Sequence, residues 1–213
     1  MAVSARAWAR LLAAGFERRY APGQILIRQG DPGAYVLALL AGRVKVFWTS
    51  AEGDDVVLAI RAAGDIIGEM AILGVADRSA TAIAIDSCTA RVIPADRFRQ
   101  LMRSPALQNE FLRHAMARLR EGEELRAELA TLTAGPRLAR TLLQFVPAGF
   151  GPPVDVALSQ SELGRAAGLS RSTVAAQLGR LRKRGAIDTG RGHVVITDLG
   201  RLRAAAGETR RNV

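Results

Sequence analysis

Cysteine and histidine are scarce in this chain of 213 residues, which contains one cysteine, Cys88, and two histidines, His114 and His193. A single cysteine excludes a disulfide within the chain. Cys88 lies in residues 81–93, which alternate like a strand, and we interpret it as a small packed residue. Two distant histidines and one cysteine form neither a nucleophile–base pair nor a metal-ligand cluster, so we predict no catalytic residues, no metal and no enzyme.

Long apolar runs are also missing. No run approaches the roughly 18 residues that a membrane-spanning helix needs, and the N-terminal segment lacks the apolar core of a secretory signal. We therefore expect a protein of the cytoplasm without a membrane partner. Hydrophobic residues still make up 49% of the chain, which is typical of a folded chain with a core rather than of a disordered one.

Positive charge is concentrated in one part of the sequence. Residues 136–213 contain thirteen basic and five acidic residues, a net charge of +8, whereas the first 134 residues carry +2. Only two of the thirty basic residues are lysines, which indicates a compositional bias toward arginine. Such a bias does not explain why the excess lies in one segment. A basic domain beside a nearly neutral one is typical of a protein that binds a polyanion.

Residues 159–185 predict two short helices joined by a tight turn. Ser159 and Glu162 have the spacing of a capping box at the start of the first helix. Gly168 ends that helix, because glycine adopts the left-handed turn conformation without steric cost, and Ser170 suits the N-cap of the second helix. Such a pair of helices suits the insertion of its second helix into a DNA major groove.

The pattern of apolar residues and turn signals divides the remainder of the chain into a strand-rich region, a helical region and a wing. Residues 18–93 contain short β-type runs between turn signals, which favours a sandwich or a barrel, and residues 2–16 look like a preceding helix. Strand signals vanish over residues 95–131, where a long helix is expected. Pro136 is tolerated in the first turn of a helix but not inside a continuing one, so a domain boundary falls there. Residues 187–196 predict two short strands around a glycine turn, which form a wing.

The long helix carries one apolar seam. Its positions step by three and four residues, which is typical of a helix face that pairs with a second copy in a two-stranded coil. Arg126 is the polar exception, and packing of the seam against the chain's own barrel is the alternative. The predicted dimer interface consists of Leu112, Ala115, Leu119, Gly122, Arg126 and Leu129.

A second informative segment runs from Gly68 to Ser79. It combines small residues in a turn-rich stretch with the carboxylate of Glu69 and the guanidinium of Arg78. Free backbone N–H groups, an arginine and a hydroxyl suit a phosphate, and a nearby carboxylate suits a ribose 2′-hydroxyl. A Glu–Arg pair on the surface, without any ligand, is the alternative.

In combination these segments resemble the cyclic AMP receptor protein and Fnr family of bacterial transcription regulators, over residues 16–196. The resemblance implies an α+β fold with an eight-stranded double-stranded β-helix (jelly-roll) barrel, a long dimerisation helix and a winged helix-turn-helix. The implied domains are residues 1–103 for the cyclic-nucleotide-binding-like sensor barrel, 104–134 for the dimerisation helix and hinge, and 135–213 for the DNA-binding domain.

The resemblance also assigns pocket residues. Glu69 matches the carboxylate that binds the ribose 2′-hydroxyl, and Arg78 and Ser79 match the pair that binds the cyclic phosphate. At the purine end, Gly122 and Glu123 stand where the cyclic AMP receptors have a Thr–Ser pair, and an ionised glutamate could accept from a purine amino group. Cyclic AMP is the favoured effector. The implied ligand set is Gly68, Glu69, Met70, Ala71, Arg78, Ser79, Arg118 and Glu123.

For DNA, the resemblance points to the second helix of the pair. Arg171, Ser172 and Thr173 match the family's base-reading and phosphate-contacting positions, and Arg171 is the best candidate for reading a guanine through O6 and N7. Ser172 and Ala176 stand where other members of the family have side chains that recognise bases more strongly. The operator should therefore differ from the family's best-known half-sites. The implied DNA-contacting set is Ser159, Ser170, Arg171, Ser172, Thr173, Gln177, Arg180, Arg182, Lys183 and Arg191.

The implied partners are a second copy of the chain, double-stranded DNA with a two-fold symmetric site and, for activation, RNA polymerase. Iron–sulfur members of the family need several N-terminal cysteines, and haem members need suitably placed His or Cys ligands, so redox and gas sensing are disfavoured. Two alternatives stay open. One is a constitutive DNA-binding regulator with a vestigial barrel pocket, and the other is a regulator whose barrel binds a different effector.

Overall fold

The computed structural model of the chain describes residues 3–74, 77–147, 149–190 and 193–207. The chain divides into two compact units, one formed by Met1–Thr49 with Arg61–Glu124 and the other by Ser50–Ile60 with Leu125–Val213. In the described ranges, no helix is both long enough and apolar enough to span a bilayer. The first unit holds most of the long strands, and the second holds α5, α6, α7 and α8.

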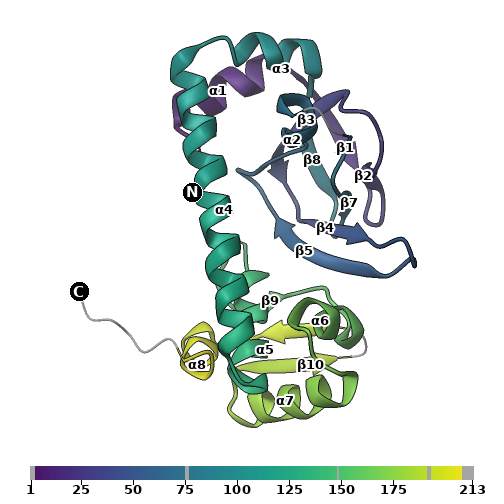
Figure 1. Cartoon of the computed structure of the whole chain (residues 1–213), viewed down its shortest axis with the longest axis vertical. Helices are drawn as coiled ribbons and strands as arrows, with labels where there is room; N and C mark the ends of the chain where they lie inside the picture. The colour runs from purple at the N-terminus through teal and green to yellow at the C-terminus, as the bar shows by residue number, and fades with distance from the viewer. Residues whose placement is uncertain (1–2, 75–76, 148, 191–192, 208–213) are drawn as a thin grey trace, which may run out of the picture. The chain divides into compact units, whose positions relative to one another are not determined.

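Eight strands form two four-stranded sheets with the orders β1-β8-β3-β6 and β2-β7-β4-β5 (Figure 1). The pairs β1–β8, β3–β8, β3–β6, β2–β7 and β4–β7 are antiparallel. Two antiparallel sheets whose neighbours are distant in sequence are typical of a jelly roll, so the predicted barrel is confirmed. The strands are β1 Phe16–Tyr20, β2 Ile25–Ile27, β3 Tyr35–Ala41, β4 Val44–Thr49, β5 Asp55–Arg61, β6 Ile66–Ile67, β7 Thr81–Ala84 and β8 Cys88–Pro94.

The alternation over residues 81–93 predicted one strand, but the structure divides this stretch into β7 and β8, which lie in different sheets. Between them, Arg43 donates to both carboxylate oxygens of Asp86, from Nε at 2.7 Å and from Nη2 at 2.9 Å. This bidentate pair holds the bend, and the hydrogen bond lowers the pKa of the Asp86 carboxyl. The single-strand prediction is wrong because the apolar alternation runs on through a turn that a distant arginine stabilises.

Four helices accompany the barrel: α1 Ala5–Ala13, α2 Met70–Leu73, α3 Ala95–Leu101 and α4 Pro105–Thr131. The helical region predicted over residues 95–131 is therefore interrupted between α3 and α4. The second helix begins at Pro105, which lacks an N–H group and so suits the first turn of a helix but not its interior.

Strand β3 is buried on both faces and joins two hydrophobic clusters. Leu37 and Leu39 point between the two sheets, whereas Val36 points to the opposite side, where α1, α3 and the first turns of α4 pack. The cluster on this side is called the outer cluster below. In it the rings of Phe98 and Phe111 meet edge to face, with centroids 5.3 Å apart. Each fully buried aliphatic or aromatic side chain contributes about 1.5–3 kcal/mol relative to an exposed one.

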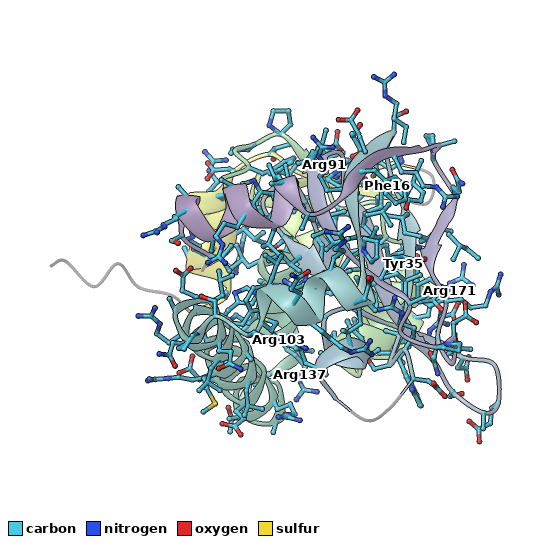
Figure 2. All side chains as sticks on the ribbon, turned by 90° about the horizontal axis from the view of Figure 1, so that it is seen from above. Phe16, Tyr35, Arg91, Arg103, Arg137 and Arg171 are labelled. Atoms are coloured by element: carbon cyan, nitrogen blue, oxygen red, sulfur yellow. The ribbon has the colours of Figure 1, made fainter. Side chains whose placement is uncertain are left out.

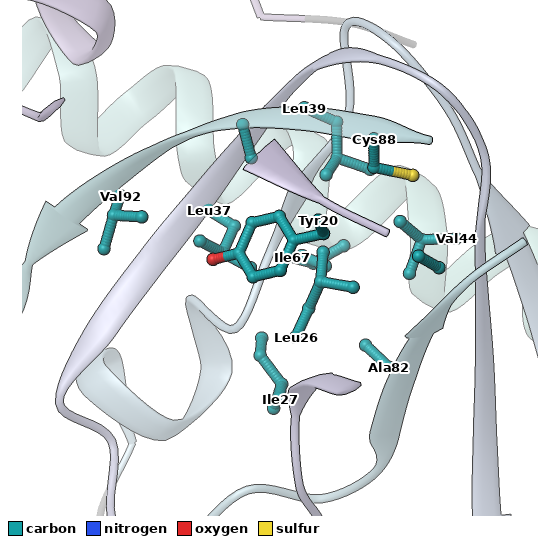
Figure 3. Packing of buried hydrophobic residues seen from close by; sticks show 12 residues of the cluster. Tyr20, Leu26, Ile27, Leu37, Leu39, Val44, Ile67, Ala82, Cys88 and Val92 are labelled. Atoms are coloured by element: carbon teal, nitrogen blue, oxygen red, sulfur yellow. The ribbon is translucent and has the colours of Figure 1, made fainter. Parts of the chain in front are cut away.

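The cluster between the sheets, called the inner cluster below, is shown in Figure 3. Cys88 is 1% exposed in it, as predicted for a packed residue, and burial raises the pKa of its thiol. The inner cluster consists of Tyr20, Leu26, Ile27, Leu37, Leu39, Val44, Ile67, Ala82, Ala84, Cys88, Ala90 and Val92, with Tyr35 and Val46 packed against it.

The second unit contains the predicted helix pair and wing, together with a third strand and a final helix that the sequence did not suggest. The three strands have the order β10-β11-β9. Besides most of β5 and the end of α4, the elements are α5 Ala134–Gln144, β9 Val154–Asp155, α6 Gln160–Ala167, α7 Arg171–Lys183, β10 Ile187–Gly190, β11 His193–Ile196 and α8 Leu199–Ala205.

The predicted caps of the helix pair are confirmed. The hydroxyl of Ser159 accepts from the backbone N–H of Glu162 at 3.2 Å, and the Glu162 carboxylate accepts from the backbone N–H of Ser159 at 2.8 Å. Gly168 has a φ of 63° and ends α6 in the left-handed conformation. Ser170 caps α7 by accepting from the backbone N–H of Thr173. These local bonds satisfy backbone groups that a helix end leaves without partners.

Candidate ligand-binding and DNA-binding sites

The chain turns sharply at Gly68, directly after β6. Its φ of +87° lies in the region that residues with a Cβ rarely adopt. A Cβ at this position would lie 2.5 Å from Nη1 of Arg78 and 2.9 Å from Cδ1 of Ile27. The turn therefore requires glycine for its backbone conformation and also for the close approach of the arginine.

The guanidinium of Arg78 is buried against this turn. The residue is 4% exposed, and it donates from Nη1 to the carbonyl oxygen of Gly68 at 2.6 Å and from Nη2 to that of Tyr35 at 2.5 Å. Its Cζ lies 5.0 Å from the centroid of the Tyr35 ring, which Figure 2 labels. Burial lowers the pKa of Arg78, while the charges of Tyr35, Glu69 and Asp31 act in the opposite direction.

These contacts leave Arg78 able to bind an anion. A guanidinium has five N–H donors, and the two carbonyl bonds use two of them. Carbonyl partners also satisfy hydrogen bonds without neutralising the positive charge, which arginine retains even when buried. The arginine thus ties β3 to the Gly68 turn and keeps its positive charge and the N–H donors that these two bonds do not use.

Of the other predicted phosphoribose residues, Glu69 is half-buried and its charge acts on Arg78, whereas Ser79 is exposed next to Arg78 in the chain. The structure therefore brings Gly68, Glu69 and Arg78 together and leaves the Ser79 hydroxyl accessible. Tyr35 was missed by sequence reasoning, because it lies 43 positions from Arg78 and no local pattern connects the two.

The predicted turn residues Met70 and Ala71 belong to the single-turn helix α2. Met70 is 66% exposed, so its backbone rather than its side chain belongs to the folded turn. The backbone of Ala71 packs closely on Gly33, where an added Cβ would lie 2.8 Å from the Ala71 carbonyl oxygen. This contact fixes α2 against the loop before β3.

The purine-end residues lie on α4. Glu123 is exposed and Gly122 is half-buried, and the side chain of Arg118 lies outside the described residues. Their assignment to the pocket stays a prediction.

The seam of α4 is largely solvent-exposed in the single chain. Leu112 is 61% exposed and Leu119 51% exposed, and Ala115 and Arg126 are exposed as well. By contrast, Leu107 and Phe111, nearer the start of the helix, are buried in the outer cluster. The side chain of Leu129 lies outside the described residues.

Met116 is a seam residue that the sequence analysis missed. It is 57% exposed and stands four positions after Leu112 and three before Leu119. These spacings place the three large apolar side chains on one stripe of the helix. The predicted seam stepped by three residues from Leu112 to Ala115 and so passed over Met116, which a step of four residues from Leu112 reaches.

Helix α7 presents a mixed surface. Val174, Leu178 and Leu181 are buried and attach the helix to its unit, while Arg171 and Arg180 are exposed. The remaining predicted DNA contacts that are exposed are Ser170, Ser172, Arg182 and Lys183, and Arg191 lies outside the described residues. The exposed cations are accessible for contacts with phosphates or base edges.

Several of the predicted DNA contacts have other neighbours within the unit. The hydroxyls of Ser159 and Ser170 serve the helix caps, and the Ser170 hydroxyl also lies 2.8 Å from that of Thr173. The carboxamide oxygen of Gln177 lies 3.1 Å from the position that a Cβ on Gly135 would take. Gln177 is thus directed toward α5, and a DNA contact would require its side chain to reorient.

Comparison with known proteins covers both units. A model of the cyclic nucleotide-binding domain matches residues 17–104, and a model of the Crp-like helix-turn-helix domain matches residues 136–205. The cyclic AMP receptor protein of Thermus thermophilus is 30% identical over 193 residues, which cover 90% of this chain and 88% of that protein. The fumarate and nitrate reduction regulatory protein of Salmonella typhimurium is 26% identical over 88% of this chain and 77% of its own length.

Among solved structures, the c-di-GMP-responsive global regulator of Xanthomonas campestris is similar in fold. Its TM-score is 0.72 at 25% sequence identity, and the match covers 91% of this chain and 99% of that chain. Two of these proteins carry names that mention different nucleotides, cyclic AMP and c-di-GMP, so the matches support the architecture more strongly than any particular ligand.

We predict that Gly68→Ala destabilises the protein more than Gly64→Ala does. Gly64 also has a positive φ, of +92°, but nothing lies within 4 Å of an added Cβ. Each variant should lose about 1–2 kcal/mol of unfolding free energy from the left-handed backbone, and Gly68→Ala should lose more because its methyl group displaces Arg78. Urea unfolding followed by circular dichroism measures both losses. Equal losses would contradict the close contact between Gly68 and Arg78.

Proposed function

Because the chain belongs to the Crp/Fnr family of DNA-binding transcription regulators and contains a cyclic nucleotide-binding domain, we propose that it acts as a homodimer controlled by cyclic AMP. The observation that carries the nucleotide proposal is the buried, carbonyl-bound guanidinium of Arg78 beside Glu69 and the Gly68 turn. The arginine and Ser79 bind the cyclic phosphate, and Glu69 binds the ribose hydroxyl. The match to the Thermus thermophilus cyclic AMP receptor protein supports this choice of effector.

The dimer forms through α4. Its exposed stripe of Leu112, Met116 and Leu119 continues beyond the turns that pack on the barrel, and burying it against a second copy removes apolar surface from water. Nucleotide binding shifts the paired helices and thereby the two helix-turn-helix units, which is an allosteric coupling between two distinct sites. The protein acts in the cytoplasm, where the chromosome lies, and RNA polymerase is the further partner when it activates transcription.

The paired helix-turn-helix units bind a two-fold symmetric site on double-stranded DNA. Two recognition helices of a dimer enter successive major grooves about 34 Å apart. Arg171, at the exposed N-terminus of α7, reads a base, and Arg180, Arg182 and Lys183 contact phosphates. The net charge of +8 over residues 136–213 supplies the electrostatic part of the affinity.

Nucleotide binding is tested by isothermal titration with cyclic AMP and cyclic GMP. Ser79→Ala should lower the affinity for cyclic AMP about tenfold or more, because a hydrogen bond to a charged group is worth about 1.5–3 kcal/mol. Ser79 is the better variant for this purpose, since it is exposed, whereas Arg78 also holds two backbone segments together. Ser87→Ala, an exposed serine between β7 and β8, is the matched control. No heat with either nucleotide, or unchanged binding by both Ser79→Ala and Arg78→Ala, would contradict the proposal.

Base reading is tested by comparing Arg171→Ala with Lys183→Ala on a set of DNA duplexes selected from a random library. Arg171→Ala should cost about 1–3 kcal/mol and relax specificity at one base pair, whereas Lys183→Ala should weaken binding uniformly and reduce the salt dependence. Fluorescence anisotropy at several salt concentrations separates the two effects. If Arg171→Ala weakened binding equally on every sequence, Arg171 would be a phosphate contact.

Dimerisation is tested by light scattering. Leu119→Glu should give particles of the 22.7 kDa chain mass where the wild type gives about twice that mass, because a buried unpaired carboxylate is strongly unfavourable. Leu73→Glu is the control, since Leu73 has the same 51% exposure as Leu119 but lies on α2. A Leu119→Glu protein with wild-type mass would show that the stripe is not the interface.

A further inference from the structure

Trp48, near the end of β4, is an exposed aromatic residue to which the preceding assignments give no role. It is 42% exposed. The chain contains only two tryptophans, and the other one, Trp8, is partly buried against the outer cluster. A single exposed apolar side chain is common on protein surfaces. The exposure of Trp48 therefore indicates a function only if its position in the barrel does so too.

Trp48 belongs to the inner face of β4. Side chains alternate between the two faces of a strand. Val44 is part of the inner cluster and Val46 packs against it, together with Ala82 and Ala84 of β7. Figure 3 shows Val44 and Ala82 in that cluster. Trp48 continues the same row, two residues beyond Val46, where the row emerges from the packed interior and becomes accessible.

The strand register brings this row to the candidate phosphate residues. Strand β4 pairs antiparallel with β7, and Phe47 lies opposite Thr81. One further step in the same register puts Trp48 opposite Ala80, the residue that follows Ser79. Neighbouring strands lie about 4.8 Å apart, so the indole stands on the wall beside the segment that carries Arg78 and Ser79.

This end of β4 is fixed by the side chain of Gln29. Its amide nitrogen donates to the carbonyl oxygen of Thr49 at 3.0 Å, and its amide oxygen accepts from the Thr49 N–H at 2.8 Å. The backbone N–H of Gln29 also donates to the hydroxyl of Thr81 at 3.1 Å. The residues on both sides of the Trp48–Ala80 step are therefore held in place, so the indole is attached to an ordered part of the barrel.

We propose that Trp48 recognises the base of the bound nucleotide by stacking its indole on the purine ring. The inference rests on the proposed function, because it takes the phosphate of that nucleotide to lie at Arg78 and Ser79. Every base offers a π-face, so stacking binds without reading individual amino or keto groups. Trp48 therefore favours purines over the smaller pyrimidines and discriminates little between adenine and guanine.

The test has two readouts. In the Trp8→Phe variant Trp48 is the sole tryptophan, and saturation with cyclic AMP should quench its fluorescence. In titration calorimetry, Trp48→Leu should lose about tenfold to a hundredfold in affinity for cyclic AMP, Trp48→Phe should recover part of that loss, and Trp8→Phe should bind like the wild type. The preference for cyclic AMP over cyclic CMP should shrink in Trp48→Leu.

The outcomes separate this inference from the function on which it rests. If the wild type binds no cyclic nucleotide, the proposed function and the role of Trp48 both fail. If the wild type binds cyclic AMP while Trp48→Leu binds equally well, with no quenching in Trp8→Phe, the stacking role is overturned and nucleotide binding stands. Circular dichroism melting of each variant confirms that a lost affinity is not a lost fold.

Discussion

The ligand end of the barrel depends on one buried charge, the guanidinium of Arg78. A cation removed from water is strongly unfavourable unless hydrogen bonds and nearby charges compensate it. Here two backbone carbonyls, the ring of Tyr35 and the charge of Glu69 supply that compensation. These partners come from β3, from the turn after β6 and from the start of α2. The requirement to satisfy one cation therefore joins two segments, β3 and the Gly68–Glu69 turn, and it also leaves no room for a side chain at Gly68.

The hydrogen-bond partners of Arg78 stabilise the fold without neutralising its charge. Neutral carbonyls stabilise the guanidinium but do not cancel its charge, so the barrel wall is folded and still cationic before any ligand arrives. An anion bound in the proposed manner would meet a preorganised site rather than one that must assemble around it. The exposed Ser79 follows Arg78 directly in the chain, and the antiparallel register of β4 and β7 ends at Phe47 and Thr81, next to Trp48 and to the segment of Arg78 and Ser79.

Features governed by neighbours along the chain were predictable from sequence. The capping box of α6, its glycine stop and the cap of α7 each involve residues within a few positions of one another. Features governed by distant partners were not. The bend between β7 and β8 depends on Arg43 and Asp86, and the burial of Arg78 depends on Tyr35. Met116 fits the helical spacing from Leu112, but only its exposure shows that the barrel leaves this position of α4 uncovered.

Strand β3 has a mechanical consequence for this unit. Its alternate side chains belong to the inner cluster and to the outer cluster, and the outer cluster includes Leu107 and Phe111 at the base of α4. Close-packed interiors have low compressibility, so β3 cannot shift on one face without displacing its neighbours on the other. Strand β3 is thus a rigid element that the inner and outer clusters share. A displacement of Leu37 or Leu39 would therefore also displace the outer cluster, which includes Leu107 and Phe111 in the first turns of α4.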